Sequence, residues 1–121
     1  MARYVDGFVV PVPKRKVGEY KKHSRLMARV FKELGALEFV ECLADDVKWG
    51  KRTSFPRSVK MKRPAETVVF SYIVYKSRRD RDRIMKKSMS DPRLAKMMDM
   101  KNLPFDARRM IFGGFRTIVD A

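Results

Sequence analysis

The stretch ETVVFSYIVYK, residues 66–76, constrains the fold more than any other part of the chain. It contains no glycine or proline and is rich in valine and aromatic residues, which predicts a β-strand. Because side chains alternate between the two faces of a strand, Phe70 and Tyr72 share one face. The opposite face carries Val69 and Ile73. Both faces are apolar, so we expect this strand to be covered on both sides.

Three further segments predict strands: Tyr4 to Val12, Leu37 to Ala44, and Arg109 to Val119. The first is closed by the prolines at positions 11 and 13. The connection from Asp45 to Pro56 has no periodic pattern and predicts a long irregular loop, a kind of segment that often carries function.

Apolar residues at three- and four-residue steps predict an amphipathic helix from Lys14 to Leu34, with lysines and arginines on the opposite arc. Gly35 suits the left-handed conformation that closes a helix. Ser77 predicts the cap of a second helix, with Asp80 completing a capping-box-like pair. Asp91 and Pro92 restart a short third helix, which we expect to turn Leu94, Met97 and Met98 inward.

The order of these elements is β-α-β-β-α-β, the ferredoxin-like arrangement of an α+β protein. It predicts one domain over residues 1–121, with a four-stranded antiparallel sheet and helices on one face. The first and last strands are also apolar on both faces. Something must therefore cover the second face: either another copy of the sheet, which makes a dimeric barrel, or nucleic-acid bases stacked on exposed aromatics.

The charge of the chain favours anionic partners. Lys and Arg number 29 against 14 Asp and Glu, a formal net charge of +15. A solvated basic surface explains this as well as a nucleic-acid footprint does. The RNA-recognition signature needs a basic residue and a glycine at the start of the third strand, and residues 67–75 lack them. We therefore expect nucleic-acid binding to be weak and non-specific.

The last strand contains IFGGF, in which two glycines interrupt a strand pattern. Glycine within a strand marks a bulge or a close approach by neighbouring groups more often than a nucleotide contact. We interpret Gly113 and Gly114 as packing positions, with Gly114 beside a dimer barrel.

Asp6 and Glu41 are carboxylates within apolar strands, and a buried carboxylate must be paired, hydrogen-bonded or protonated. One interpretation makes either residue a general acid or base with a raised pKa. The other makes it a structural pair or an edge group. The partners expected for them are Arg109, Arg116, and the hydroxyls of Tyr4 and Tyr72.

His23 is the only histidine and Cys42 the only cysteine. Neither has acidic or thiol neighbours at ligand spacing, so no metal site and no intrachain disulfide are expected. A single cysteine suits the cytoplasm, and no segment resembles a signal peptide or a membrane span. The late methionines predict core filling or an adaptable apolar pocket. These are Met85, Met89, Met97, Met98, Met100 and Met110.

Several strings of the chain resemble, in the same order, the YbaA-like family of small bacterial proteins of unknown function. They include YVDGFVVPVP, FKELGALEFVECLADDV, TVVFSYIVYKSRRDRD, SDPRLAKMMD and PFDARRMIFGGF. The resemblance implies a dimeric α+β barrel, in which two ferredoxin-like sheets pack face to face. The same superfamily contains antibiotic-biosynthesis monooxygenases. The resemblance implies no reaction, cofactor or catalytic residue.

These observations predict a cytoplasmic homodimer without a cofactor that binds a small organic molecule between sheet and helices. An enzyme of the same fold, a cofactor-independent monooxygenase or isomerase, is the first alternative, and a basic RNA-associated protein is the second. The candidate catalytic residues are Asp6, His23, Glu41 and Tyr72. The candidate ligand-binding residues are Tyr20, Trp49, Phe70 and Phe112.

Overall fold

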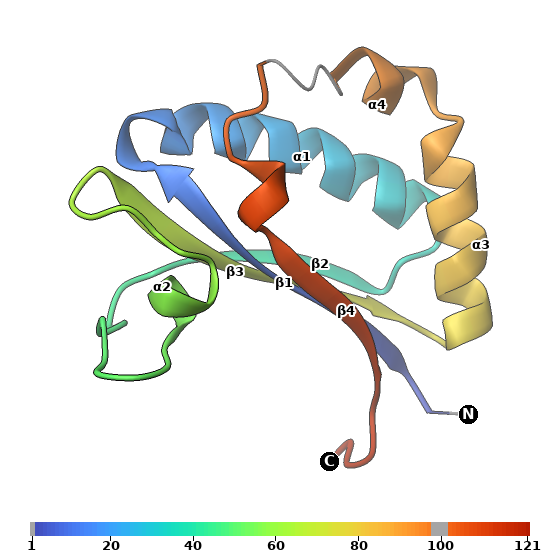
Figure 1. The fold of residues 1–121 in the computed structure, drawn as a ribbon. Helices are drawn as coiled ribbons and strands as arrows, with labels where there is room; N and C mark the ends of the chain where they lie inside the picture. Colours follow the sequence, from blue (N-terminus) through green and yellow to red (C-terminus); the bar gives the residue numbers. More distant parts are fainter. Residues whose placement is uncertain (1, 98–101) are drawn as a thin grey trace.

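The computed structural model describes residues 2–97 and 102–121, and its strands form one antiparallel sheet (Figure 1). The strands are β1 (Tyr4–Pro13), β2 (Glu38–Leu43), β3 (Glu66–Tyr75) and β4 (Ile111–Arg116). Their spatial order is β2-β3-β1-β4, so the two strands that are longest and most apolar lie at the centre. This confirms the predicted α+β arrangement.

The longer helices of the described residues lie on one side of the sheet (Figure 1). They are α1 (Val17–Leu34), which follows a 3₁₀ turn at Lys14–Lys16, α3 (Arg78–Met89) and α4 (Pro92–Met97). The predicted helix ends are confirmed: Gly35 closes α1 with φ 117°, and the Ser77 hydroxyl accepts a hydrogen bond from the amide of Asp80. None of these described helices is long and apolar enough to cross a bilayer.

The core lies between these helices and the sheet. Ile73 and Tyr75 of β3 pack against Val30 and Phe31 of α1 and Ile84 of α3, all of them buried. The apolar stripe of α1 and the helix-facing side of β3 therefore meet, as their two periodicities predict. Met98 and Met100, expected in the core or a pocket, lie outside the described residues.

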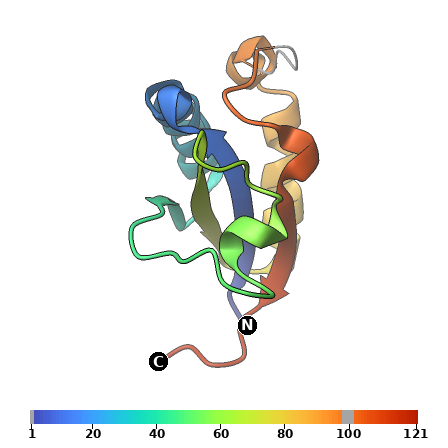
Figure 2. The ribbon, with the colours of Figure 1, turned by 60° about the vertical axis from the view of Figure 1, so that its left-hand side comes forward.

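The second face of the sheet is partly covered by the chain itself. The connection between β2 and β3, drawn in green, lies away from α1 and α4 (Figure 1 and Figure 2). It carries a short helix, α2 (Phe55–Ser58), and buries Val59 against Val9 and Val68 at one end of that face. The segment predicted to be an irregular loop therefore ends in a helix, which the Ser54 hydroxyl caps by accepting a hydrogen bond from the amide of Arg57.

The last strand is shorter than predicted, since β4 runs from Ile111 to Arg116. Arg109 lies in a 3₁₀ turn, Ala107–Arg109, capped by Asp106. Its guanidinium donates to both carboxylate oxygens of Glu66, at 2.8 and 2.7 Å. This bidentate ion pair holds the segment that leads into β4. The alternation of side chains along the sequence does not predict such a pair.

Candidate functional site

A cavity of about 160 Å³ lies between α1 and the helix-facing side of the sheet. Its polar wall consists of Tyr20, His23 and Ser24 of α1, Glu41 of β2, and Ser71 of β3. The helical residues share the inward stripe of α1, and Glu41 pairs in register with Ser71, so both project to the same side. We call this cavity the Glu41 chamber. The rest of its wall is apolar and is formed by Phe8, Val10, Met27, Phe39, Ile73, Phe105 and Met110.

One carboxylate oxygen of Glu41 lacks a partner. The Oε2 atom is buried and has no hydrogen-bond partner among the described residues. Burial raises the pKa of the carboxyl above its ordinary value, and hydrogen bonds from the hydroxyls of Tyr20, Ser71 and Ser24 lower it without outweighing burial. None of the described lysines and arginines contributes to that balance. A buried acceptor in this state is ready to bind a donor from outside the chain.

Tyr20 and His23 form the wall beside it. The ring of Phe105 meets both edge-on, at centroid distances of 5.8 Å from Tyr20 and 6.0 Å from His23. Burial raises the pKa of Tyr20, and burial lowers the pKa of His23. The phenol is therefore protonated and the imidazole neutral at pH 7, so each can donate and accept a hydrogen bond.

Asp6 occupies a different environment on β1. The Tyr75 hydroxyl donates to Asp6 Oδ2 at 3.0 Å, and Arg81 Nη1 lies 3.5 Å from Oδ1. Burial raises the pKa of Asp6, while Tyr75 and Arg81 lower it by smaller amounts. Arg81 also donates to the Tyr4 hydroxyl at 3.1 Å and lies over its ring. Asp6 is thus held in a structural network.

The partners predicted for the two carboxylates are wrong. Tyr4 binds Arg81, the partner of Asp6, and does not bind Asp6 itself. Arg109 binds Glu66. Tyr72 neighbours Phe70 on β3, and neither Tyr72 nor Arg116 is hydrogen-bonded to either carboxylate. Alternation along the strand puts Tyr72 on the face opposite Ser71, away from the chamber.

The other predicted ligand-binding residues lie elsewhere. Phe70 lies on the face opposite the chamber and meets the ring of Phe55 at 5.9 Å. The ring of Trp49 is held in the β2–β3 connection, with the guanidinium of Arg63 3.9 Å from its centroid. Phe112 is 65% exposed and stacks on Phe8 at the edge of the sheet. Of the predicted site residues, the structure therefore brings together Tyr20, His23 and Glu41.

Sequence reasoning did not select Ser24, Ser71 or Phe105 as chamber residues. The two serines are polar residues at core-facing positions of a helix and a strand, and both are buried. A polar side chain at a core-facing position is the sequence signal that could have identified them as chamber residues. Phe105 gives no such signal, because its place depends on the path of the chain between α4 and β4.

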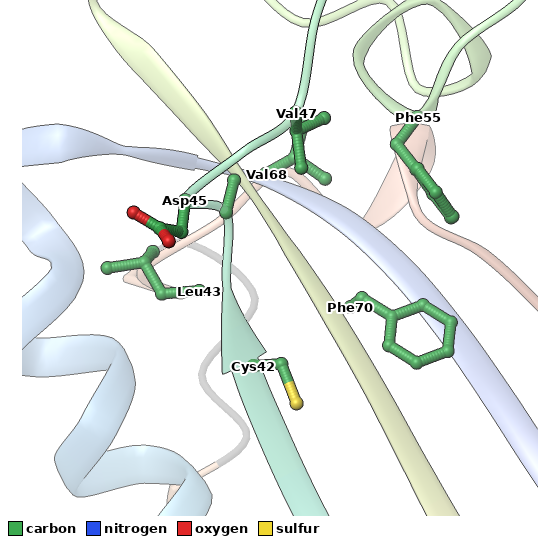
Figure 3. A pocket seen from close by; sticks show the side chains of 8 residues that line it. Cys42, Leu43, Asp45, Val47, Phe55, Val68 and Phe70 are labelled. Carbon is green, nitrogen blue, oxygen red and sulfur yellow. The ribbon is translucent and has the colours of Figure 1, made fainter.

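The sheet face opposite the chamber carries an apolar groove of about 250 Å³ (Figure 3). Cys42 and Phe70 lie side by side on its floor, and Phe55 and Val47 come from the β2–β3 connection. The side chains of Ile111 and Phe115 are 46% and 64% exposed on the same face. The groove and these two side chains form one apolar surface, which we call the open face. Its residues are Cys42, Val47, Phe55, Phe70, Ile111 and Phe115. Across the described residues, no group of three or more His, Cys, Asp or Glu side chains is placed to hold a metal ion.

Gly114 faces the helices, whereas Gly113 faces away from them. A Cβ atom on Gly114 would lie 2.6 Å from Tyr4 Cε2 and 2.7 Å from Arg81 Nη2, far inside ordinary contact. On Gly113 it would meet only Phe115, at 3.7 Å. The close packing expected at Gly114 is therefore present, but it is made with the Asp6 network. The place of Gly114 beside a dimer barrel stays a prediction.

Comparisons with known proteins agree with this architecture. The chain is 48% identical over 118 residues to the uncharacterized protein YbaA of Escherichia coli K12 and of Shigella flexneri, covering 98% of each chain. A crystal structure of a dimeric ferredoxin-like protein from an uncultured marine organism matches with a TM-score of 0.59 and 8% identity, over 100% of both chains. The family described as "Protein of unknown function (DUF1428)" matches residues 3–107. The chain therefore belongs to the DUF1428 family, to which its resemblance to YbaA also points.

Proposed function

We propose that this protein is a cytoplasmic homodimer that binds a small organic molecule in the Glu41 chamber. The observation that carries the proposal is the buried Glu41 Oε2 atom, which belongs to a residue of the cavity lining and accepts no hydrogen bond from the described residues. A buried polar atom without a partner costs about 1–3 kcal/mol. A ligand that donates a hydrogen bond recovers this cost, whereas core packing alone leaves it uncompensated.

The chamber selects the chemistry of that ligand. Glu41 accepts a hydrogen bond, and a primary amine serves it best because the ammonium also supplies the missing cation. The apolar walls favour a hydrocarbon group next to the donor. A volume of 160 Å³ holds a group of about five non-hydrogen atoms, taking roughly 30 Å³ for each.

The test measures the affinity of the protein for n-butylamine and for n-butanol. Binding is detected by NMR chemical shifts of the chamber residues and by calorimetry. We expect the amine to bind more tightly than the alcohol. Glu41→Gln should weaken amine binding about tenfold or more, because the charge-assisted hydrogen bond is lost. Glu38→Gln is the matched control, since Glu38 is an exposed residue of the same strand. Equal binding by both variants would contradict the proposal.

The homodimer is supported by the open face, whose exposed aromatic and aliphatic side chains would be covered by a second copy of the chain. The structural neighbour is described as dimeric. Sedimentation at micromolar concentration should give the mass of two chains. Phe115→Glu should give one chain, whereas Phe112→Glu, equally exposed on the other face, should not. A wild-type mass of one chain would remove this part of the proposal.

An isomerase is the second candidate, because a carboxyl with a raised pKa and a neutral imidazole line the same cavity. Such a pair can take a proton from a carbon next to a carbonyl and return it elsewhere. 2-Butanone in deuterated water, with five non-hydrogen atoms, is a direct probe. Exchange of its α-hydrogens by the wild type and not by Glu41→Gln would favour catalysis over binding alone.

A further inference from the structure

A second cavity of about 320 Å³ lies next to the Glu41 chamber, between α1, α3, α4 and the sheet. Phe8, Met27 and Ile73 line both cavities, so the two share a wall. We call the second cavity the methionine chamber. Met85, Met89 and Met97 complete its methionine lining, and the exposed residues Met89 and Ala95 place its rim at the surface.

The described wall of the methionine chamber offers no free hydrogen-bonding side chain. Ser88 is its polar residue, and the Ser88 hydroxyl donates to the backbone oxygen of Met85 at 2.7 Å. The remaining side chains are thioether, aliphatic or aromatic. Methionine is flexible and polarizable, so such a wall adapts to apolar groups of different shape. The two neighbouring chambers thus differ sharply in chemistry.

We propose that one ligand fills both chambers, with a hydrogen-bond-donating amine head on Glu41 and an apolar body among the methionines. This inference rests on the proposed function and specifies its ligand class, an amphiphilic amine. Met27 lines both cavities, and its flexible side chain can change rotamer without moving the backbone. The methionine chamber has room for about ten non-hydrogen atoms, taking roughly 30 Å³ for each.

The experiment measures the affinity of n-alkylamines from ethylamine to decylamine, each below its micelle-forming concentration. Affinity should rise about fourfold for each added methylene while the chain enters the methionine chamber, and then level off. The affinity of phenylbutylamine is measured as well, and it tests whether the methionine chamber binds a ring in place of a straight chain. Either body supports the inference if it binds at least tenfold more tightly than n-butylamine, which fills the Glu41 chamber alone.

Ala95→Trp places a bulky ring on the wall of the methionine chamber. This substitution should weaken the binding of octylamine and leave the binding of ethylamine unchanged. Lys96→Trp, on the same helix and outside the lining, is the matched control for folding and surface effects. Glu41→Gln should weaken every amine in the series.

Two results would overturn the inference and are distinguishable. Short amines that bind through Glu41 with no gain from longer chains would leave the proposed function standing and remove the amphiphile. Absence of binding by any amine would overturn the proposed function and the inference together.

Discussion

Asp6 and Glu41 make an instructive pair. Both are acidic residues in apolar strands, both face the helices, and burial raises the pKa of each. Asp6 is bound by the Tyr75 hydroxyl and lies beside Arg81. Among the described residues, Glu41 has one buried oxygen without a partner, and no cation shifts its pKa. A carboxylate on the helix-facing side of a strand is thus a structural anchor in one case and an open acceptor in the other.

The difference comes from the opposite layer of the fold. Arg81 of α3 reaches down to Asp6, while α1 presents hydroxyls and an imidazole above Glu41. A buried carboxylate whose charge is paired with a cation stabilises the fold. A buried carboxylate that lines a cavity and has no paired cation indicates a ligand site.

The largest expected effect is at the anchored carboxylate. Asp6→Ala should lower the free energy of unfolding by about 3 kcal/mol, because it leaves Arg81 and the Tyr75 hydroxyl without their partner. Urea unfolding measures this. Asp120→Ala, which removes the partner of Arg3 in an exposed ion pair, should change stability little. If the two substitutions had similar effects, Asp6 would not be an anchor.

Gly114→Val tests the same anchor from the neighbouring strand. The added side chain should collide with Tyr4 and Arg81 and cost about 1–3 kcal/mol, even though valine favours strands. Gly113→Val meets only Phe115 and should leave monomer stability nearly unchanged. Thermal unfolding compares the two. A harmless Gly114→Val would mean that Tyr4 and Arg81 move aside freely.

Glu41→Gln should have the smallest effect on the free energy of unfolding, and it should raise this free energy, whereas the preceding substitutions lower it. A carboxyl whose pKa is raised by folding contributes stability that is full below its ordinary pKa of 4.5 and is lost as pH rises through the folded value. Without ligand, the variant should therefore be more stable than the wild type at pH 8, by on the order of 1 kcal/mol. The difference should close toward pH 4. A variant less stable at every pH would show that Glu41 is already satisfied.

Local signals predicted much of the fold. Gly35, Ser77 and Pro92 mark helix ends through backbone geometry that neighbouring residues determine, and the order of elements then limits the sheet to few arrangements. The ion pair of Glu66 with Arg109 joins residues far apart in sequence and depends on strand register and side-chain reach. It could not be predicted, and neither could the shortened β4 that accompanies it.

The site was predicted in part for a similar reason. Tyr20, His23 and Glu41 lie at positions whose periodicity faces the core, so one cavity collects them. Phe70, Trp49 and Phe112 were ligand-binding candidates and Tyr72 was a catalytic candidate. Their residue types do not specify which face of the sheet they lie on. The single domain over residues 1–121, the cytoplasmic location and the weak nucleic-acid binding stay predictions.

The most direct test of the account is a carbon-13 NMR titration of the side-chain carboxyls with and without saturating n-octylamine. An ammonium beside Glu41 should lower the pKa of that carboxyl. The account predicts that the titration midpoint of Glu41 falls on adding the amine while that of Asp6 stays in place. An unchanged Glu41 midpoint, or an equal fall at both residues, would contradict the claim that Glu41 is the open acceptor of a ligand site.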